Sequence, residues 1–144
     1  MNLDELRNMS QQGQNDMERR ILQLCDPQKI AQEIKDELMA EAKKAAQTGK
    51  RKSTIVYTLF ERKVSRISGS YNNTDERSGP LAECGDGIDN WRQLSNVLFS
   101  MVQRYVQDDN IRLELEESDI GGLAELKRGG MWLWAMIIRA TVSW

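Results

Sequence analysis

The side chains that could do chemistry in this chain of 144 residues are carboxylates, amines, guanidiniums and two thiols, because the sequence contains no histidine. The lack of histidine excludes a Ser-His-Asp triad, a histidine zinc site and a histidine general base. Cys25 and Cys84 lie far apart and form no CxxC pair, so we expect both to be small buried hydrophobes in a reduced protein. No cofactor and no metal is expected.

Cations are concentrated in the middle of the chain. Residues 43–66 carry eight bases and one acid, whereas the segments on either side are net acidic. A basic segment of this kind predicts a site for a polyanion or an acidic partner. The alternative is a solvated helix end and a charged strand edge, where cations favour the helix dipole and prevent aggregation. The candidate residues for binding a protein partner or nucleic acid are Lys43, Lys44, Lys50, Arg51, Lys52, Arg62, Lys63 and Arg66.

A second charged cluster is acidic and follows the segment expected to be the third helix. Its carboxylates could hold a divalent cation or face a basic, DNA-binding partner, although they lack the glycine and glutamate offsets of an EF-hand. The alternative is a solvated strand face. This secondary patch consists of Asp108, Asp109, Glu114, Glu116, Glu117 and Asp119.

Residues 68–88 are rich in Gly and polar side chains and predict a long loop, a kind of segment that is usually functional or mobile. Its end, residues 83–90, has glycines before a helix start, as phosphate-binding loops do. Acids surround these glycines and no GK[ST] motif follows, so a helix cap with glycine turns is the prediction. Cys84 has no base to activate it as a nucleophile.

Apolar residues at spacings of three and four predict a helical hairpin over residues 1–48 and a helix over 89–107. Asp26 and Pro27 mark the start of the second helix, since Asp caps orphan N–H groups and Pro is tolerated at the first helical position. Thr48 and Gly49 end that helix. Polar residues 10–15, which include Gly13, interrupt the row of apolar residues along the first helix.

Strand composition appears in three segments: 53–67, which is a strand or a hairpin, 111–117, and 131–144. In the last segment every even position from Trp132 to Trp144 is apolar, which predicts a long strand in the centre of a sheet. The chain is therefore expected to be one α+β domain. Two N-terminal helices and one central helix pack on a small, mainly antiparallel sheet that ends in a long C-terminal strand.

These features favour a non-enzymatic interaction protein, an inhibitor or adaptor, that binds a macromolecular protein partner through its charged surfaces. The first alternative is nucleic-acid binding through residues 43–66, and the second is a carboxylate-based enzyme or metal-binding protein. Small histidine-free proteins without catalytic motifs are often phage or mobile-element accessory proteins, an association that comes from no particular residue.

We expect a cytoplasmic protein with no membrane contact, because no apolar run is long enough to span a bilayer and the N-terminus lacks an export signal. A homodimer could form through the apolar stripe Leu3, Leu6 and Met9 of the first helix. Trp144 could serve as an interface anchor at the end of the last strand.

Overall fold

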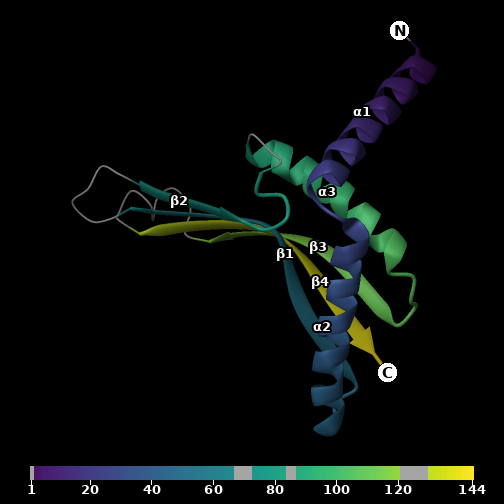
Figure 1. The fold of residues 1–144 in the computed structure, drawn as a ribbon, viewed down its shortest axis with the longest axis vertical. Helices are drawn as coiled ribbons and strands as arrows, with labels where there is room; N and C mark the ends of the chain where they lie inside the picture. Colours follow the sequence, from purple (N-terminus) through teal and green to yellow (C-terminus); the bar gives the residue numbers. More distant parts are fainter. Residues whose placement is uncertain (1, 67–72, 84–86, 121–129) are drawn as a thin grey trace.

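A computed structural model describes residues 2–66, 73–83, 87–120 and 130–144 (Figure 1). The fold is α+β, as predicted, with three helices and a four-stranded antiparallel sheet in this part of the chain. In chain order the elements are α1 (Leu3–Leu24), α2 (Pro27–Gln47), β1 (Lys52–Arg66), β2 (Asn73–Ser78), α3 (Ile88–Tyr105), β3 (Ile111–Ile120) and β4 (Met131–Ser143).

Two of the helices begin at residues whose side chains cap them. The Asn2 side chain accepts a hydrogen bond from the Glu5 N–H at 2.9 Å and completes a capping box at the start of α1. Asp26 accepts from the backbone N–H groups of Gln28 and Lys29, and Pro27 follows as the first residue of α2. The predicted start and end of α2 are therefore confirmed.

The first two helices do not fold back on each other as the expected hairpin would. They diverge at Cys25, and α1 points away from the sheet while α2 runs alongside it (Figure 1). Met17 and Ile21 of α1 contact the core, and Arg104 of α3 reaches Glu18 at 3.2 Å. α1 is continuous through Gly13, because the polar residues there face water and keep helical geometry.

The strands are arranged in the order β2-β1-β4-β3, and every neighbouring pair is antiparallel. The two long strands, β1 and β4, are central, which confirms the position predicted for the C-terminal strand. The predicted loop over 68–88 is wrong over residues 73–78, because these residues form β2. β2 has no apolar alternation, since it is a short exposed edge strand that pairs only with β1.

The core lies between the helices and one face of the sheet. On β4 the residues that face the helices are Trp134, Met136, Ile138, Ala140 and Val142, and each is at most 7% exposed. These are five of the seven even positions singled out in the sequence; the first, Trp132, is only partly buried. Trp144 follows the strand, is 48% exposed, and donates its backbone N–H to the Arg51 carbonyl at 3.0 Å.

β1 contains an irregularity that lets two successive side chains enter the core. Its register against β4 shifts between Thr58 and Phe60, so Leu59 is an extra residue, and both Leu59 and Phe60 are fully buried. The Leu59 carbonyl accepts a hydrogen bond from the Leu81 N–H at 3.1 Å. The bulge therefore attaches the segment after β2 to the centre of β1.

Gly79 permits this attachment. Its φ is +95°, and a Cβ at this position would lie 2.6 Å from the Leu59 carbonyl oxygen. We expect Gly79→Ala to lower the free energy of unfolding by about 3 kcal/mol, because a left-handed backbone is strained and the backbone of β1 cannot move aside. Urea unfolding followed by circular dichroism measures the change.

Gly49→Ala is the matched control. Gly49 also has a positive φ, +82°, but nothing lies within 4 Å of a Cβ built there. This variant should lose only about 1 kcal/mol, from backbone strain alone. Equal losses at the two positions would show that the contact with Leu59 does not matter.

Candidate functional site

One face of the sheet has no helix on it among the residues described. Alternate β4 positions point away from the core, and they form an apolar stripe of Met131, Leu133, Ala135 and Ile137. Met131 is 40% exposed, and Val56 on the neighbouring strand is 45% exposed. We call this surface the open face. Ala135 is buried by its neighbours on the sheet, although it lies outside the core cluster.

Two carboxylates on the open face, those of Glu114 and Glu116, are held by arginines of the same face, whereas Glu61 and Glu76 also lie on this face and have no ion pair among the described residues. Arg139 makes two hydrogen bonds to Glu116, at 2.9 and 3.1 Å, and Arg112 lies 2.6 Å from Glu114. The hydrogen bonds from Arg139 lower the pKa of Glu116. Glu116 is therefore ionised and paired with Arg139, and it is not poised to act as a general acid, which needs a raised pKa. Glu114 is paired with Arg112.

The predicted basic residues form two separate groups. Lys43, Lys44, Lys50, Arg51 and Lys52 gather where α2 ends and β1 begins, and all are exposed. Arg62, Lys63 and Arg66 lie near the other end of β1, at roughly 3.3 Å per residue along the strand, or about 33 Å from Lys52 to Arg62. Because one long extended strand separates them, the eight residues do not form one patch.

The second basic group is also divided between the two faces of the sheet. Lys63 lies on the open face opposite Leu133, whereas Arg62 lies on the helix-facing side opposite Trp134. Arg62 hydrogen-bonds to Asp75 at 3.2 and 3.0 Å and lowers its pKa. Arg66 ends β1, and its side chain lies outside the described part. Only Lys63 of this group is exposed and unpaired among the residues with described side chains.

Within the first basic group, Lys44 is paired with Glu41 at 3.3 Å. Lys43, Lys50, Arg51 and Lys52 have no ion pair with any residue that the structure describes. We call the five residues Lys43, Lys44, Lys50, Arg51 and Lys52 the basic corner. Lys52 also lines a hollow of about 600 Å³ at the end of the open face, together with Thr54, Arg112, Arg139 and Thr141. The basic corner is therefore continuous with the open face.

The six acids of the predicted secondary patch are dispersed. Asp108 accepts from the Asn110 N–H in the turn before β3, and Asp109 is exposed in that turn. Register places Glu114 and Glu116 on the open face, and it places Glu117 and Asp119 on the helix-facing side. Between residues 2 and 144, excluding the undescribed gaps, no three acidic or cysteine side chains gather where they could share a metal ion.

Three arginines that sequence reasoning did not single out make specific contacts, and two of them contact helix-facing aromatic residues. Arg77 lies 4.9 Å from the ring centre of Trp91, which stacks on Phe60 at 4.2 Å. Arg92 lies over Trp134 and pairs with Glu117, and both the Arg92 guanidinium and the Trp134 N–H lower the pKa of that carboxyl. The third, Arg139, pairs across the open face. No sequence signal marks these contacts, because they depend on strand register.

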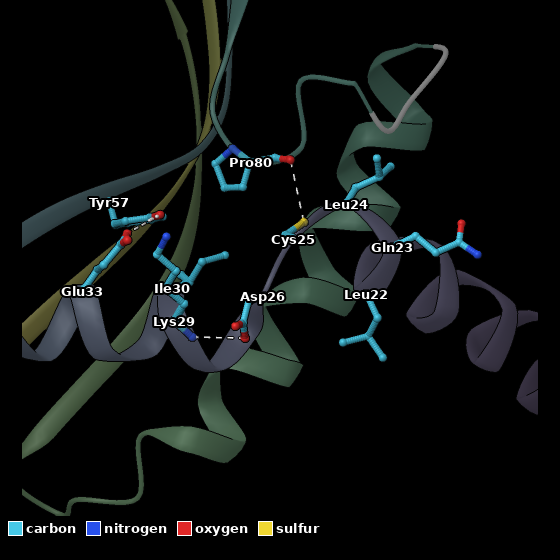
Figure 2. Close-up of a pocket in the computed structure, with 10 residues that line it drawn as sticks. All are labelled: Leu22, Gln23, Leu24, Cys25, Asp26, Lys29, Ile30, Glu33, Tyr57 and Pro80. Carbon is cyan, nitrogen blue, oxygen red and sulfur yellow. Dashed lines mark hydrogen bonds between the residues drawn. The ribbon is translucent and has the colours of Figure 1, made fainter.

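A second hollow, of about 500 Å³, lies at the junction of α1 and α2 (Figure 2). Its wall includes Cys25, whose thiol donates to the Pro80 carbonyl at 3.7 Å, and Tyr57, whose hydroxyl donates to Glu33 at 3.1 Å. Burial, followed by the charge of Glu33, raises the pKa of Tyr57 to about 12. The phenol is therefore a protonated hydrogen-bond donor at neutral pH that ties β1 to α2. It is not a catalytic base.

Cys84 and much of the predicted loop lie outside the described residues. No helix in the described part of the chain combines the length and apolar character needed to cross a membrane. Comparison of the chain with protein-family models, curated proteins and solved structures found no match. The surfaces themselves are therefore the basis for a functional proposal.

The Tyr57–Glu33 contact can be tested by alkaline titration. The pKa of Tyr57 rises from 10.0 to about 12 on folding, so its contribution to stability is complete below pH 10 and is lost as the pH rises towards 12. We expect the tyrosinate absorbance of the protein, minus that of Tyr57→Phe, to have its midpoint near pH 12. A midpoint near pH 10 in this difference titration would contradict the hydrogen bond between Tyr57 and Glu33.

Proposed function

We propose that the protein is a non-enzymatic interaction protein that binds a protein partner across its open face. The observation that carries the proposal is that helices of the described part of the chain cover only one side of the most apolar strand, β4. Its other side presents the exposed Met131 and the partly exposed Leu133 and Ile137, and the exposed Val56 of β1 lies near Ile137. Apolar side chains exposed on a face with a charged rim are typical of protein–protein interaction sites.

The charges around the open face indicate the character of the partner. The acids that the edge strand β3 places on this face, Glu114 and Glu116, are neutralised by arginines. Lys52 and Lys63, near opposite ends of the face, have no ion pair among the described residues. A partner that supplies an apolar centre and carboxylates at its rim would match this distribution and would be steered by it.

The proposal is tested by capture of binding proteins from a cell lysate, with and without nuclease, using the unchanged protein and two open-face variants. We expect a partner that survives nuclease, and we expect Val56→Asp and Met131→Asp each to weaken its binding at least tenfold, since each introduces a charge among the exposed apolar side chains of the open face. Dissociation constants for the purified partner are then measured by calorimetry.

Leu3→Asp is the control, because Leu3 is 67% exposed but lies on α1, away from the open face. This variant should bind as the unchanged protein does. Circular dichroism confirms that each variant is folded. Binding that survives both open-face substitutions, or is lost equally in the control, contradicts the proposed site.

Nucleic-acid binding is the second candidate, and it is favoured by the basic corner. Four of its five cations have no ion pair among the described residues. The open face itself is poorly suited to bind bases, because its described residues include no aromatic side chain on which a base could stack. Nucleic acid would therefore be bound through phosphate contacts at the basic corner, beside which lies the half-exposed Trp144, whose backbone N–H donates to the Arg51 carbonyl.

The second candidate predicts a steep salt dependence. If the basic corner binds a nucleic acid, then Lys50→Ala, Arg51→Ala and Lys52→Ala should each reduce the slope of log affinity against log salt by about one unit. Fluorescence anisotropy with a labelled oligonucleotide measures the slope, and Lys35→Ala on α2 serves as the control. Slopes unchanged by all three substitutions would exclude the basic corner as a phosphate-binding site.

A carboxylate-based enzyme or metal-binding protein is the least supported of the three. Arginines lower the pKa values of Glu116 and Glu117. The acidic residues lie on different faces and gather into no ligand set within the described ranges.

A further inference from the structure

The two edges of the sheet differ in a way that bears on assembly. β2 forms one edge, has six residues, and is polar throughout. β3 forms the other edge, has ten residues, and carries Ile111, Leu113 and Leu115 on its helix-facing side, where they are only half-buried. Short polar edges resist pairing with other chains, whereas long edges with an apolar side favour it.

The backbone groups that β3 presents at this edge follow from its pairing with β4. The Ser143 N–H donates to the Asn110 carbonyl at 3.2 Å, and the register pairs Arg112 with Thr141 and Glu114 with Arg139. In an antiparallel pair, hydrogen-bonded residues alternate with residues whose N–H and C=O point outward. Leu113 and Leu115 therefore direct their backbone groups away from β4. No strand in the described ranges pairs with them.

We propose that β3 pairs antiparallel with β3 of a second copy and so joins the two sheets into one. The register is centred on Leu113, which lies opposite the partner's Leu113. Ile111 then lies opposite the partner's Leu115 on the helix-facing side. On the open face Arg112 lies opposite the partner's Glu114, and Glu114 opposite the partner's Arg112.

Charge complementarity favours a second copy of this chain as the partner of β3, and it favours this register of pairing. The pairing centred on Leu113 places opposite charges together twice, and the outward-pointing backbone groups of the two Leu113 residues meet each other. Moving the centre by one residue towards the N-terminus would place Arg112 opposite itself, and moving it towards the C-terminus would place Glu114 opposite itself. In both cases like charges would meet directly. When two copies of the sequence Ile-Arg-Leu-Glu-Leu over 111–115 run antiparallel, apolar residues therefore meet apolar residues and Arg meets Glu.

The β3 edge differs from the apolar stripe invoked for partner binding, and only Arg112 and Glu114 border both surfaces. Edge pairing leaves the open face of each copy accessible and makes the two faces continuous. It also removes the outward-pointing backbone groups of Leu113 and Leu115 from water. The inference does not depend on the identity of any partner of the open face.

Sedimentation equilibrium over a concentration series tests the proposal. We expect the unchanged protein to approach twice the monomer mass as its concentration rises. Arg112→Glu and Glu114→Arg should each weaken association about tenfold or more, since each creates two like-charge contacts. The double variant that carries both substitutions should restore association. These side chains face solvent, so the core of each monomer is preserved.

Two controls separate this interface from others. Glu76→Arg, on the edge strand β2, should leave association unchanged. Leu6→Asp tests the stripe of α1, and association that is lost in this variant but kept in Arg112→Glu would assign the dimer to α1 and overturn the proposal. A monomer at all concentrations, or a double variant that fails to restore association, would overturn it as well.

Hydrogen exchange gives an independent measurement. The backbone N–H of Leu113 should exchange more slowly as the protein concentration rises, whereas the N–H groups of β2 should not change. Exchange at Leu113 that is independent of concentration while the mass doubles would show that the copies associate elsewhere.

Discussion

The alternation of side chains along β4 is the constraint on which the rest of the structure depends. β4 pairs with β1 on one side and with β3 on the other, so it holds the sheet together. One set of its side chains packs under the helices and the other set faces away. A one-residue slip in either pairing would exchange these two sets, burying the polar side chains and exposing Trp134 and Ile138. The core and the open face are therefore two consequences of one register.

A second interaction connects the part of the sheet under the helices with the part that extends beyond them (Figure 1). Phe60 lies at the β1 bulge, stacks on Trp91 of α3, and lies 5.4 Å from Trp134. Farther out, Arg62 pairs with Asp75 and lies 5.5 Å from the ring centre of Trp132, whose N–H donates to Asp119 at 2.7 Å. These contacts link all four strands where helix packing has ended. They give the extended end of the open face a fixed geometry, as a binding surface requires.

The distribution of charge follows from the same arrangement. Most carboxylates on β2 and β3 find an arginine within the fold, so the acidic character evident in the sequence is largely neutralised there. The basic corner has only Glu41 to neutralise it among the described residues. A chain with a net charge of −2 thus presents a group of unpaired cations at the basic corner, which lies at one end of the open face. Local pairing, and not total charge, determines which surface can attract a partner.

Much of the fold could be predicted from local patterns. The caps of α2, the helical spacing in α2 and α3, and the apolar even positions of β4 depend on residues close together in the sequence, and the structure confirms each of them. Three features depended on contacts between distant residues. β2 forms although its sequence is polar, because β1 supplies its hydrogen-bond partners. The basic residues of 43–66 are divided because β1 is one long extended strand. Arg77, Arg92 and Arg139 meet their aromatic and acidic partners only through strand register. Sequence periodicity determines which side of an element is apolar, whereas tertiary structure decides what covers that side, because coverage depends on which distant elements pack against it.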